Sequence, residues 1–352
     1  MMNAQNIPLD MRQWRSPRFY IPLILIGILF MMPLVIYDPI FLHLMILIFF
    51  YAYLTLSWNV VGGFAGQLSL GHTAFTGIGA YTSTLLFIQL GVTPWIGMFI
   101  GGIFAAIAAI TIGYPCFKLR GAYFALATIG FVETLRIAIE STNEVFGIQF
   151  KGAMGMTLPL MGHSPLNFQF LSKAYYYYII LIMMLIALYI TYRISKSRLG
   201  YYLFAIKNDL DAAQSLGVDV SRCRLKAAAL SAFLTGLGGT FYAQLVLFID
   251  PAGIIGLYLS FEIAFIAIIG GRGTLLGPVL GSFLLIPVSE LTRIYLGGTY
   301  FGVHLVVFGG VLMLVMLFLP RGINDPIIHA YSRVIERLEK ANLQTEVDHG
   351  TS

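Results

Sequence analysis

The residues most able to take part in chemistry are acidic side chains inside strongly apolar segments. Glu262 lies in the middle of one such segment and has no basic residue within a helical turn. A carboxylate in a membrane must face protein or water, where it could relay a proton or hydrogen-bond a neighbouring helix. Glu133 and Arg136 have the i, i+3 spacing of an ion pair on one helix face, and Glu290 repeats it with Arg293. These pairs would anchor helix ends or a gate.

A polar stretch, residues 195–226, interrupts the apolar chain. Within it, Asn208 or Asp209 can cap a short helix over residues 211–216, because their side-chain oxygens accept hydrogen bonds from the first N–H groups of a helix. Gly217 suits the left-handed residue that ends many helices. The sequence therefore predicts a compact helix in a polar environment.

This short helix is a candidate docking site for a separate motor protein. Its two consecutive alanines would form a flat side that the groove of a bulky partner could hold. The chain has no G-x-x-x-x-G-K-[ST] phosphate loop, so nucleotide hydrolysis would have to come from another protein. The candidate coupling residues are Asn208, Asp209, Asp211, Ala212, Ala213 and Gly217.

A glycine-rich segment, residues 62–79, contains six glycines among several polar residues. Irregular backbone at membrane depth is tolerated only where it is buried in protein or lines a cavity. The segment is therefore a candidate lining of a translocation path, and a tight loop followed by a closely packed helix is the alternative. The candidate path residues are Gly66, Gln67, Ser69, Gly71 and His72. Close helix packing is the expected role of the glycines at 97 and 101, at 236–239, and at 277 and 281.

Composition identifies the elements that must position these residues. Of the 352 residues, 58% are hydrophobic and 11% are charged, and the mean hydropathy is +0.84. A helix needs about 20 apolar residues to cross a bilayer. The apolar runs predict an all-α integral membrane protein with about ten transmembrane helices, near residues 19–37, 39–61, 72–90, 94–115, 121–140, 174–194, 226–248, 255–270, 276–296 and 301–319.

Lys and Arg residues near the span ends predict the orientation, because they are enriched on the cytoplasmic side. If both termini are cytoplasmic, 17 of the 21 Lys and Arg residues lie inside, and Arg136, Lys151, Lys173 and Arg293 lie outside. This arrangement requires an even number of spans and places residues 195–226 in the cytoplasm. The first apolar run lacks a small-residue cleavage site, so we expect an uncleaved first span.

The sequence also predicts a larger organisation. A transmembrane domain is expected over residues 1–322 and a cytoplasmic tail over 323–352. Within the tail, residues 327–338 form an amphipathic stripe suited to the inner membrane surface or a partner subunit.

The sequence contains a possible internal repeat. Asp-Pro followed about twenty residues later by Gly-Gly occurs at 38–63 and again at 250–271. This pattern indicates either a parallel duplication of four spans or residues that commonly occur in loops and turns.

The predicted outer loop, residues 141–173, is expected to be a lid or docking surface, and a packed loop is the alternative.

Several of these segments resemble a known family. Asp211-Ala212-Ala213-x-x-x-Gly217 resembles the Glu-Ala-Ala-x-x-x-Gly loop by which ABC importer permeases engage their ATPases, with Asp in place of Glu and without the following Leu-Pro. Over residues 40–322 the chain is similar to branched-chain amino acid permeases of the LivM type. The segments that carry this similarity are WNVVGGFAGQLSLGH at 58–72, AIKND at 205–209, GGRGTLLGP at 270–278 and FLPRG at 318–322.

The resemblance implies a permease subunit, not an enzyme, in a bacterial inner membrane. Its expected partners are a second homologous permease, two ATPase subunits, an extracytoplasmic substrate-binding protein and membrane lipid, with no nucleic acid. No cofactor is expected. The two cysteines, Cys116 and Cys223, lack metal-ligand spacing in their surroundings and both fall on the predicted cytoplasmic side, so neither a metal site nor a disulfide is expected.

Branched-chain or related hydrophobic amino acids are the substrates that the resemblance implies. Related permeases carry urea and short amides, and no residue of this chain discriminates between these substrates. The alternative from another functional class is an ion-coupled secondary transporter that uses Glu262 as its protonation site.

Overall fold

The computed structural model describes residues 17–145, 148–296, 302–319 and 322–326. Contacts divide the chain into two units, one formed by residues 39–324 and the other by residues 1–38 with 325–352. The described helix of the second unit is α1 (Pro17–Val35). The amphipathic stripe expected at 327–338 lies outside the described residues.

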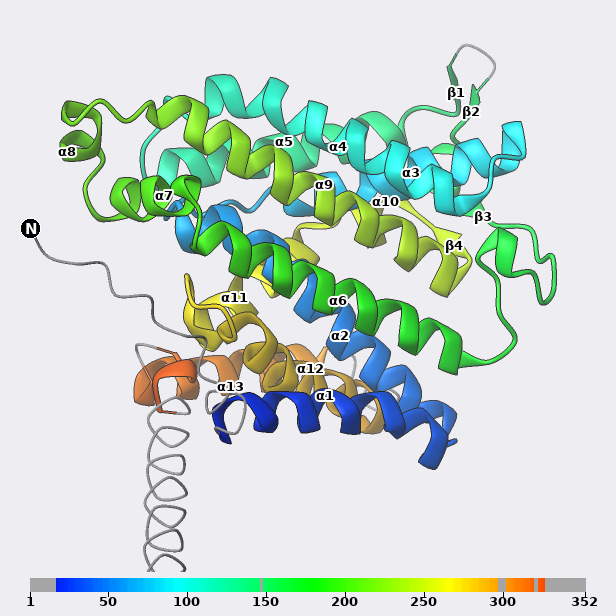
Figure 1. The fold of residues 1–352 in the computed structure, drawn as a ribbon. Coiled ribbons are helices and arrows are strands. Elements are labelled where there is room, and N and C mark those ends of the chain that lie inside the picture. The colour runs from blue at the N-terminus through cyan, green and yellow to red at the C-terminus, as the bar shows by residue number, and fades with distance from the viewer. Residues whose placement is uncertain (1–16, 146–147, 297–301, 320–321, 327–352) are drawn as a thin grey trace, which may run out of the picture. The chain divides into compact units, whose positions relative to one another are not determined.

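The larger unit is built almost entirely from helices (Figure 1), which confirms the all-α class. Its helices are α2 (Pro39–Asn59), the π-helical turn η2 (Val60–Phe64), α3 (His72–Leu90), α4 (Pro94–Cys116), α5 (Ala122–Glu140), α6 (Lys173–Ser195), α7 (Arg198–Asn208), α8 (Leu210–Ser215), α9 (Val220–Val246), α10 (Pro251–Ile254), α11 (Leu257–Gly271), α12 (Gly277–Leu296) and α13 (Val303–Phe318). Figure 1 shows α8 at one end of this unit and the short strands at the other; we call these the α8 end and the opposite end.

Each of the ten predicted spans overlaps a helix. Among the described residues, six helices are both long and apolar enough to cross a membrane: Pro39–Phe64, Pro94–Cys116, Ala122–Glu140, Lys173–Ser195, Val220–Val246 and Pro251–Gly271. Ile24–Val35 and Leu305–Phe318 are apolar but shorter. The structure therefore supports a multi-span membrane protein, and the count of ten is not confirmed.

Glycines let α3, α4 and α9 approach backbone to backbone, as the sequence predicts. A Cβ atom on Gly79 would overlap the carbonyl of Gly236 in α9, and one on Gly239 would overlap the carbonyl of Thr76 in α3. A Cβ on Gly101 of α4 would lie 2.8 Å from the Gly79 carbonyl oxygen. These three helices form one closely packed layer because a larger side chain at these positions would separate their backbones.

The loop between α5 and α6 packs against the end of α9. Its strands β1 (Glu144–Val145) and β2 (Ile148–Gln149) form an antiparallel pair, and β3 (Met156–Thr157) pairs antiparallel with β4 (Phe248–Ile249). The loop also contains the 3-10 turns η3 (Gly152–Met154) and η4 (Pro165–Asn167). Phe168 is buried whereas Leu166, two residues earlier, is exposed, so the loop combines packed and exposed apolar side chains.

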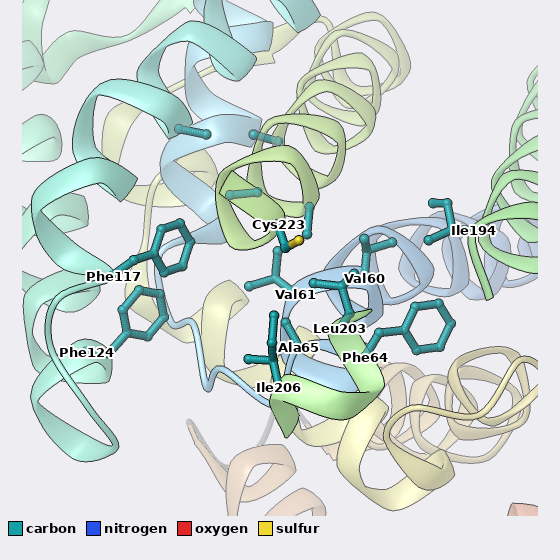
Figure 2. Packing of buried hydrophobic residues seen from close by; sticks show 14 of the residues in the cluster. Val60, Val61, Phe64, Ala65, Phe117, Phe124, Ile194, Leu203, Ile206 and Cys223 are labelled. Atoms are coloured by element: carbon teal, nitrogen blue, oxygen red, sulfur yellow. The ribbon is translucent and has the colours of Figure 1, made fainter. Parts of the chain in front are cut away.

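At the α8 end, an apolar cluster joins the polar stretch to the long helices (Figure 2). Val61 and Phe64 come from η2, Leu203 and Ile206 come from α7, and Cys223 comes from α9. The buried side of α7 is thus part of the main core, because its apolar residues recur at helical spacing.

Candidate functional site

The predicted short helix exists as α8, and its two ends are capped as the residue types suggest. Asp209 Oδ1 accepts hydrogen bonds from the N–H groups of Asp211 and Ala212, each at 3.0 Å. Asn208 instead ends α7. Gly217 has a φ of +85°, and the N–H of Val218 donates to the Ala213 carbonyl, which is the Schellman pattern of helix termination.

The two alanines of α8 do not form a shared flat side, which corrects that expectation. Ala213 is buried in the core cluster, whereas Ala212 is exposed. Alanines that follow each other in a helix point about 100° apart, so one face of a short helix cannot present both. The exposed surface instead ends in Leu216, whose side chain is 85% exposed.

Asp211 is held by a cation from another part of the chain. The two terminal nitrogens of the Arg120 guanidinium, Nη2 and Nη1, donate to the Asp211 carboxylate at 2.9 and 3.3 Å. Arg120 lies in the connection between α4 and α5, and both side chains are largely exposed. An ion pair this exposed contributes little to stability, but it orients α8 relative to the connection.

The glycine-rich segment leaves helical geometry after η2 and is fixed by hydrogen bonds. The indole Nε1–H of Trp58 donates to the Ser69 carbonyl at 2.7 Å, and the Leu70 N–H donates to Thr128 Oγ1 on α5 at 3.1 Å. A Cβ atom at Gly62 would overlap the Trp58 ring. The predicted break in the helix is therefore real, and its residues are buried in protein except Gly66 and Leu68, which are exposed.

His72 connects this segment to two long helices. Its Nδ1 lies 3.1 Å from Ser69 Oγ, and its Nε2 lies 2.8 Å from Ser231 Oγ on α9. The Ser231 hydroxyl also donates to the Ser57 carbonyl on α2 at 2.6 Å. Of the five candidate path residues, Gly66 is exposed, and Gln67, Ser69, Gly71 and His72 are buried. Ser69, Gly71 and His72 also line a small cavity together with residues of α4 and α5.

At the α8 end, the glycine-rich segment after α2 meets a second one, residues 270–277, which connects α11 to α12. The side chain of Asn59 accepts a hydrogen bond from the Gly273 N–H and donates one to the Thr274 carbonyl, each at 2.8 Å. A Cβ atom at Gly63 would lie 2.6 Å from the Gly273 nitrogen. We call this contact between residues 59–66 and 271–274 the glycine junction.

Lys207 of α7 lies against the glycine junction from the side of the polar stretch. A Cβ atom on Gly66 would lie 2.9 Å from Lys207 Cγ, and one on Gly273 would lie 2.7 Å from Lys207 Nζ. Burial lowers the pKa of the Lys207 ammonium, and the positive charge of Arg272 lowers this pKa further. The candidate coupling residues and the candidate path segment are thus joined by a residue that the sequence analysis did not assign to the site. Its position in the AIKND segment was the available signal.

Glu262 of α11 is buried, with 3% of its surface exposed, and accepts a hydrogen bond from the Tyr51 hydroxyl at 2.7 Å. Interhelical hydrogen bonding, one of the two roles expected for Glu262, is therefore present.

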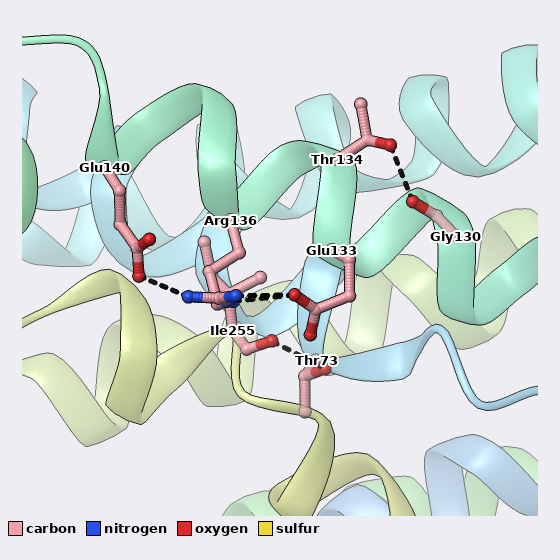
Figure 3. A network of polar contacts seen from close by, with 7 residues as sticks. All are labelled: Thr73, Gly130, Glu133, Thr134, Arg136, Glu140 and Ile255. Carbon is pink, nitrogen blue, oxygen red and sulfur yellow. Dashed lines mark hydrogen bonds and ion pairs between the residues drawn. The ribbon is translucent and has the colours of Figure 1, made fainter.

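The two predicted ion pairs form, because Arg136 donates to Glu133 (Figure 3) and Arg293 donates to Glu290, each at 2.6 Å. Arg136 also donates to Glu140 at 2.6 Å, a contact that the sequence analysis did not predict.

The chain is similar in sequence to a family of known proteins. The family model described as the permease component of branched-chain amino acid transport systems matches residues 40–318. The chain is 30% identical over 294 residues to the high-affinity branched-chain amino acid transport system permease protein LivM of Escherichia coli strain K12, covering 78% of the chain and 67% of that relative. The LivM protein of Salmonella typhimurium is 28% identical over 295 residues, with the same coverage.

A second group of relatives carries a different name. The high-affinity branched-chain amino acid transport system permease protein LivH of Escherichia coli strain K12 is 25% identical over 286 residues, which cover 78% of this chain and 90% of that relative. No solved structure matches the chain. The range matched by the family model includes the polar stretch of residues 195–226 and the glycine junction.

Proposed function

Because the chain belongs to the family of permease components of branched-chain amino acid transport systems, we propose that it forms part of the translocation path of an ATP-driven importer. A second, related permease subunit completes the path, and two ATPase subunits and an extracytoplasmic binding protein complete the complex. The substrates are branched-chain or related hydrophobic amino acids, as the names of the relatives suggest.

The observation that carries this proposal is the contact between Lys207 and both halves of the glycine junction. The exposed helix α8 follows α7 directly, with the single residue Asp209 between them. A push on α8 by an ATPase would therefore move α7, and Lys207 would transmit the movement to the segments that follow α2 and α11. Such movement of packed elements between two arrangements is a common route from a local event to a global change.

The proposal includes the orientation of the chain and the membrane that it spans. The α8 end is cytoplasmic, both termini are cytoplasmic, and the chain spans a bacterial inner membrane. The concentration of Lys and Arg residues on the α8 side of the spans supports this orientation. The transmembrane domain of residues 1–322 and the cytoplasmic tail of residues 323–352 stay part of the proposal.

Reconstituted transport tests the function. The full complex in proteoliposomes is expected to accumulate radiolabelled L-leucine only when ATP is supplied on the α8 side, with loss of uptake when the catalytic sites of the ATPases are inactivated. Dissipating the proton gradient is expected to leave uptake unchanged, because the driving force is hydrolysis.

The second candidate function, a proton-coupled transporter, rests on the buried Glu262 and its hydrogen bond from Tyr51. It predicts uptake by this chain alone that follows a proton gradient and is lost in Glu262→Gln. Uptake of that kind, without ATP, would replace the first proposal.

A further inference from the structure

A cavity of about 590 Å³ opens at the opposite end of the bundle from α8. It lies where α2 and α6 begin and where α9 and α12 end. Its polar lining comprises His43, Tyr51, Lys173, Tyr242, Glu290 and Arg293. Ligand sites for small molecules have typical volumes of about 300–1,000 Å³ and a few polar groups among apolar walls. The cavity has the size and composition of such a site, and we call it the vestibule.

Charges of both signs face the vestibule. Arg293 donates to Glu290 at 2.6 Å, and the Arg293 side chain is 56% exposed while that of Glu290 is 15% exposed. The Lys173 side chain supplies a second cation from the start of α6 and donates to the Pro39 carbonyl at 3.4 Å. A ligand with one carboxylate and one ammonium group would match two cations and a carboxylate, since charge-assisted hydrogen bonds to Arg are strong and directional.

The rest of the vestibule suits an apolar side chain. Leu47, Phe170 and Leu245 contribute apolar surface from three different segments. His43 also lines the vestibule, but its Nδ1 atom is closed off from solvent and has no hydrogen-bond partner in the structure.

The vestibule also leads inward. Tyr51 lines it, and the Tyr51 hydroxyl donates a hydrogen bond to Glu262, which is buried in α11. The polar lining thus continues from the mouth toward the interior of the bundle along α2, the helix that ends at the glycine junction.

We propose that the vestibule is a low-affinity receiving site for a zwitterionic, apolar α-amino acid, with the carboxylate at Arg293 and Lys173 and the ammonium group at Glu290. The proposal rests on the proposed function, because it assigns the place where the released substrate first contacts this chain. Low affinity follows because Arg293 must exchange part of its contact with Glu290 for the ligand.

Ligand-observed saturation-transfer NMR on the full-length chain in lipid nanodiscs tests this site. The probe is L-leucine, compared with 4-methylpentanoate, which lacks the ammonium group, and leucinamide, which lacks the carboxylate. L-leucine is expected to bind about tenfold more tightly than either analogue, since each analogue loses one charge-assisted contact. Equal binding of the three compounds would overturn the assignment, and this comparison needs no variant.

A matched pair of variants locates the binding. Arg293→Gln is expected to weaken L-leucine binding about tenfold, and Arg293→Lys to weaken it less, because the positive charge is kept. Arg136→Gln serves as the control, since Arg136 forms an i, i+3 pair of the same kind at the same end of the bundle and does not line the vestibule. Unchanged binding in Arg293→Gln, or an equal loss in Arg136→Gln, would overturn the site.

Failure of this inference and failure of the proposed function give different results. Binding to the wild-type chain in nanodiscs requires neither ATP nor ATPase. Specific L-leucine binding without ATP-driven uptake would contradict the importer function and leave the vestibule in place. ATP-driven uptake together with equal L-leucine binding by wild type and Arg293→Gln would leave the importer and overturn the vestibule.

Discussion

Gly217→Val is expected to abolish ATP-driven uptake while the chain still inserts and folds. Gly217 has a φ of +85°, where a β-branched residue is strained by roughly 1–2 kcal/mol or more. The helix that it terminates, α8, has six residues, so it has few internal hydrogen bonds with which to offset that strain. Uptake into proteoliposomes and binding of the ATPase subunits to the detergent-solubilised chain measure the effect.

Gly91→Val is the matched control. Gly91 ends α3 with a φ of +66°, and like Gly217 it has open space where a side chain would be added. The backbone strain is therefore similar, but the site lies away from α8. Uptake near the wild-type rate is expected for Gly91→Val, and equal losses in the two variants would show that strain alone, and not α8, explains the defect.

Gly239→Val is expected to prevent folding. A side chain there would overlap the Thr76 carbonyl and would lie 2.8 Å from its carbon atom and 3.1 Å from the Ala80 nitrogen, all of which are backbone atoms of α3. Relief requires α3 and α9 to separate, which would cost roughly 3 kcal/mol or more. Fluorescence-detected size-exclusion chromatography of the expressed protein should show loss of the monodisperse peak.

Gly130→Val controls for the loss of a helical glycine. Gly130 lies inside α5, and nothing lies within 4 Å of the position that its Cβ atom would occupy. The monodisperse peak is expected to persist in this variant. A normal peak for Gly239→Val would mean that α3 and α9 do not pack backbone to backbone.

Local features of the fold could be predicted from the sequence because they depend on neighbouring residues. The apolar runs locate the helices, Asp209 locates the start of α8, and Gly217 locates its end. The packing role of Gly236–Gly239 was also predictable, because small residues mark close helix contacts.

Features that depend on tertiary packing could not be predicted. The glycine junction joins Asn59 to Gly273, which are more than two hundred positions apart in the chain, and no local pattern pairs them. The burial of Ala213 depends on which side of α8 meets α9, and the sequence of a six-residue helix does not specify that side. The vestibule likewise combines residues from four helices.

The proposal that α8 engages an ATPase is tested most directly by site-specific cross-linking. Both cysteines, Cys116 and Cys223, are free and would first be replaced by serine. Leu216, 85% exposed after α8, and Leu166, 75% exposed at the opposite end, would then each be changed to cysteine in the assembled complex. With a thiol cross-linker, Leu216→Cys is predicted to give a covalent adduct with the ATPase subunit and Leu166→Cys none. An ATPase adduct from Leu166→Cys, with none from Leu216→Cys, would contradict the proposal.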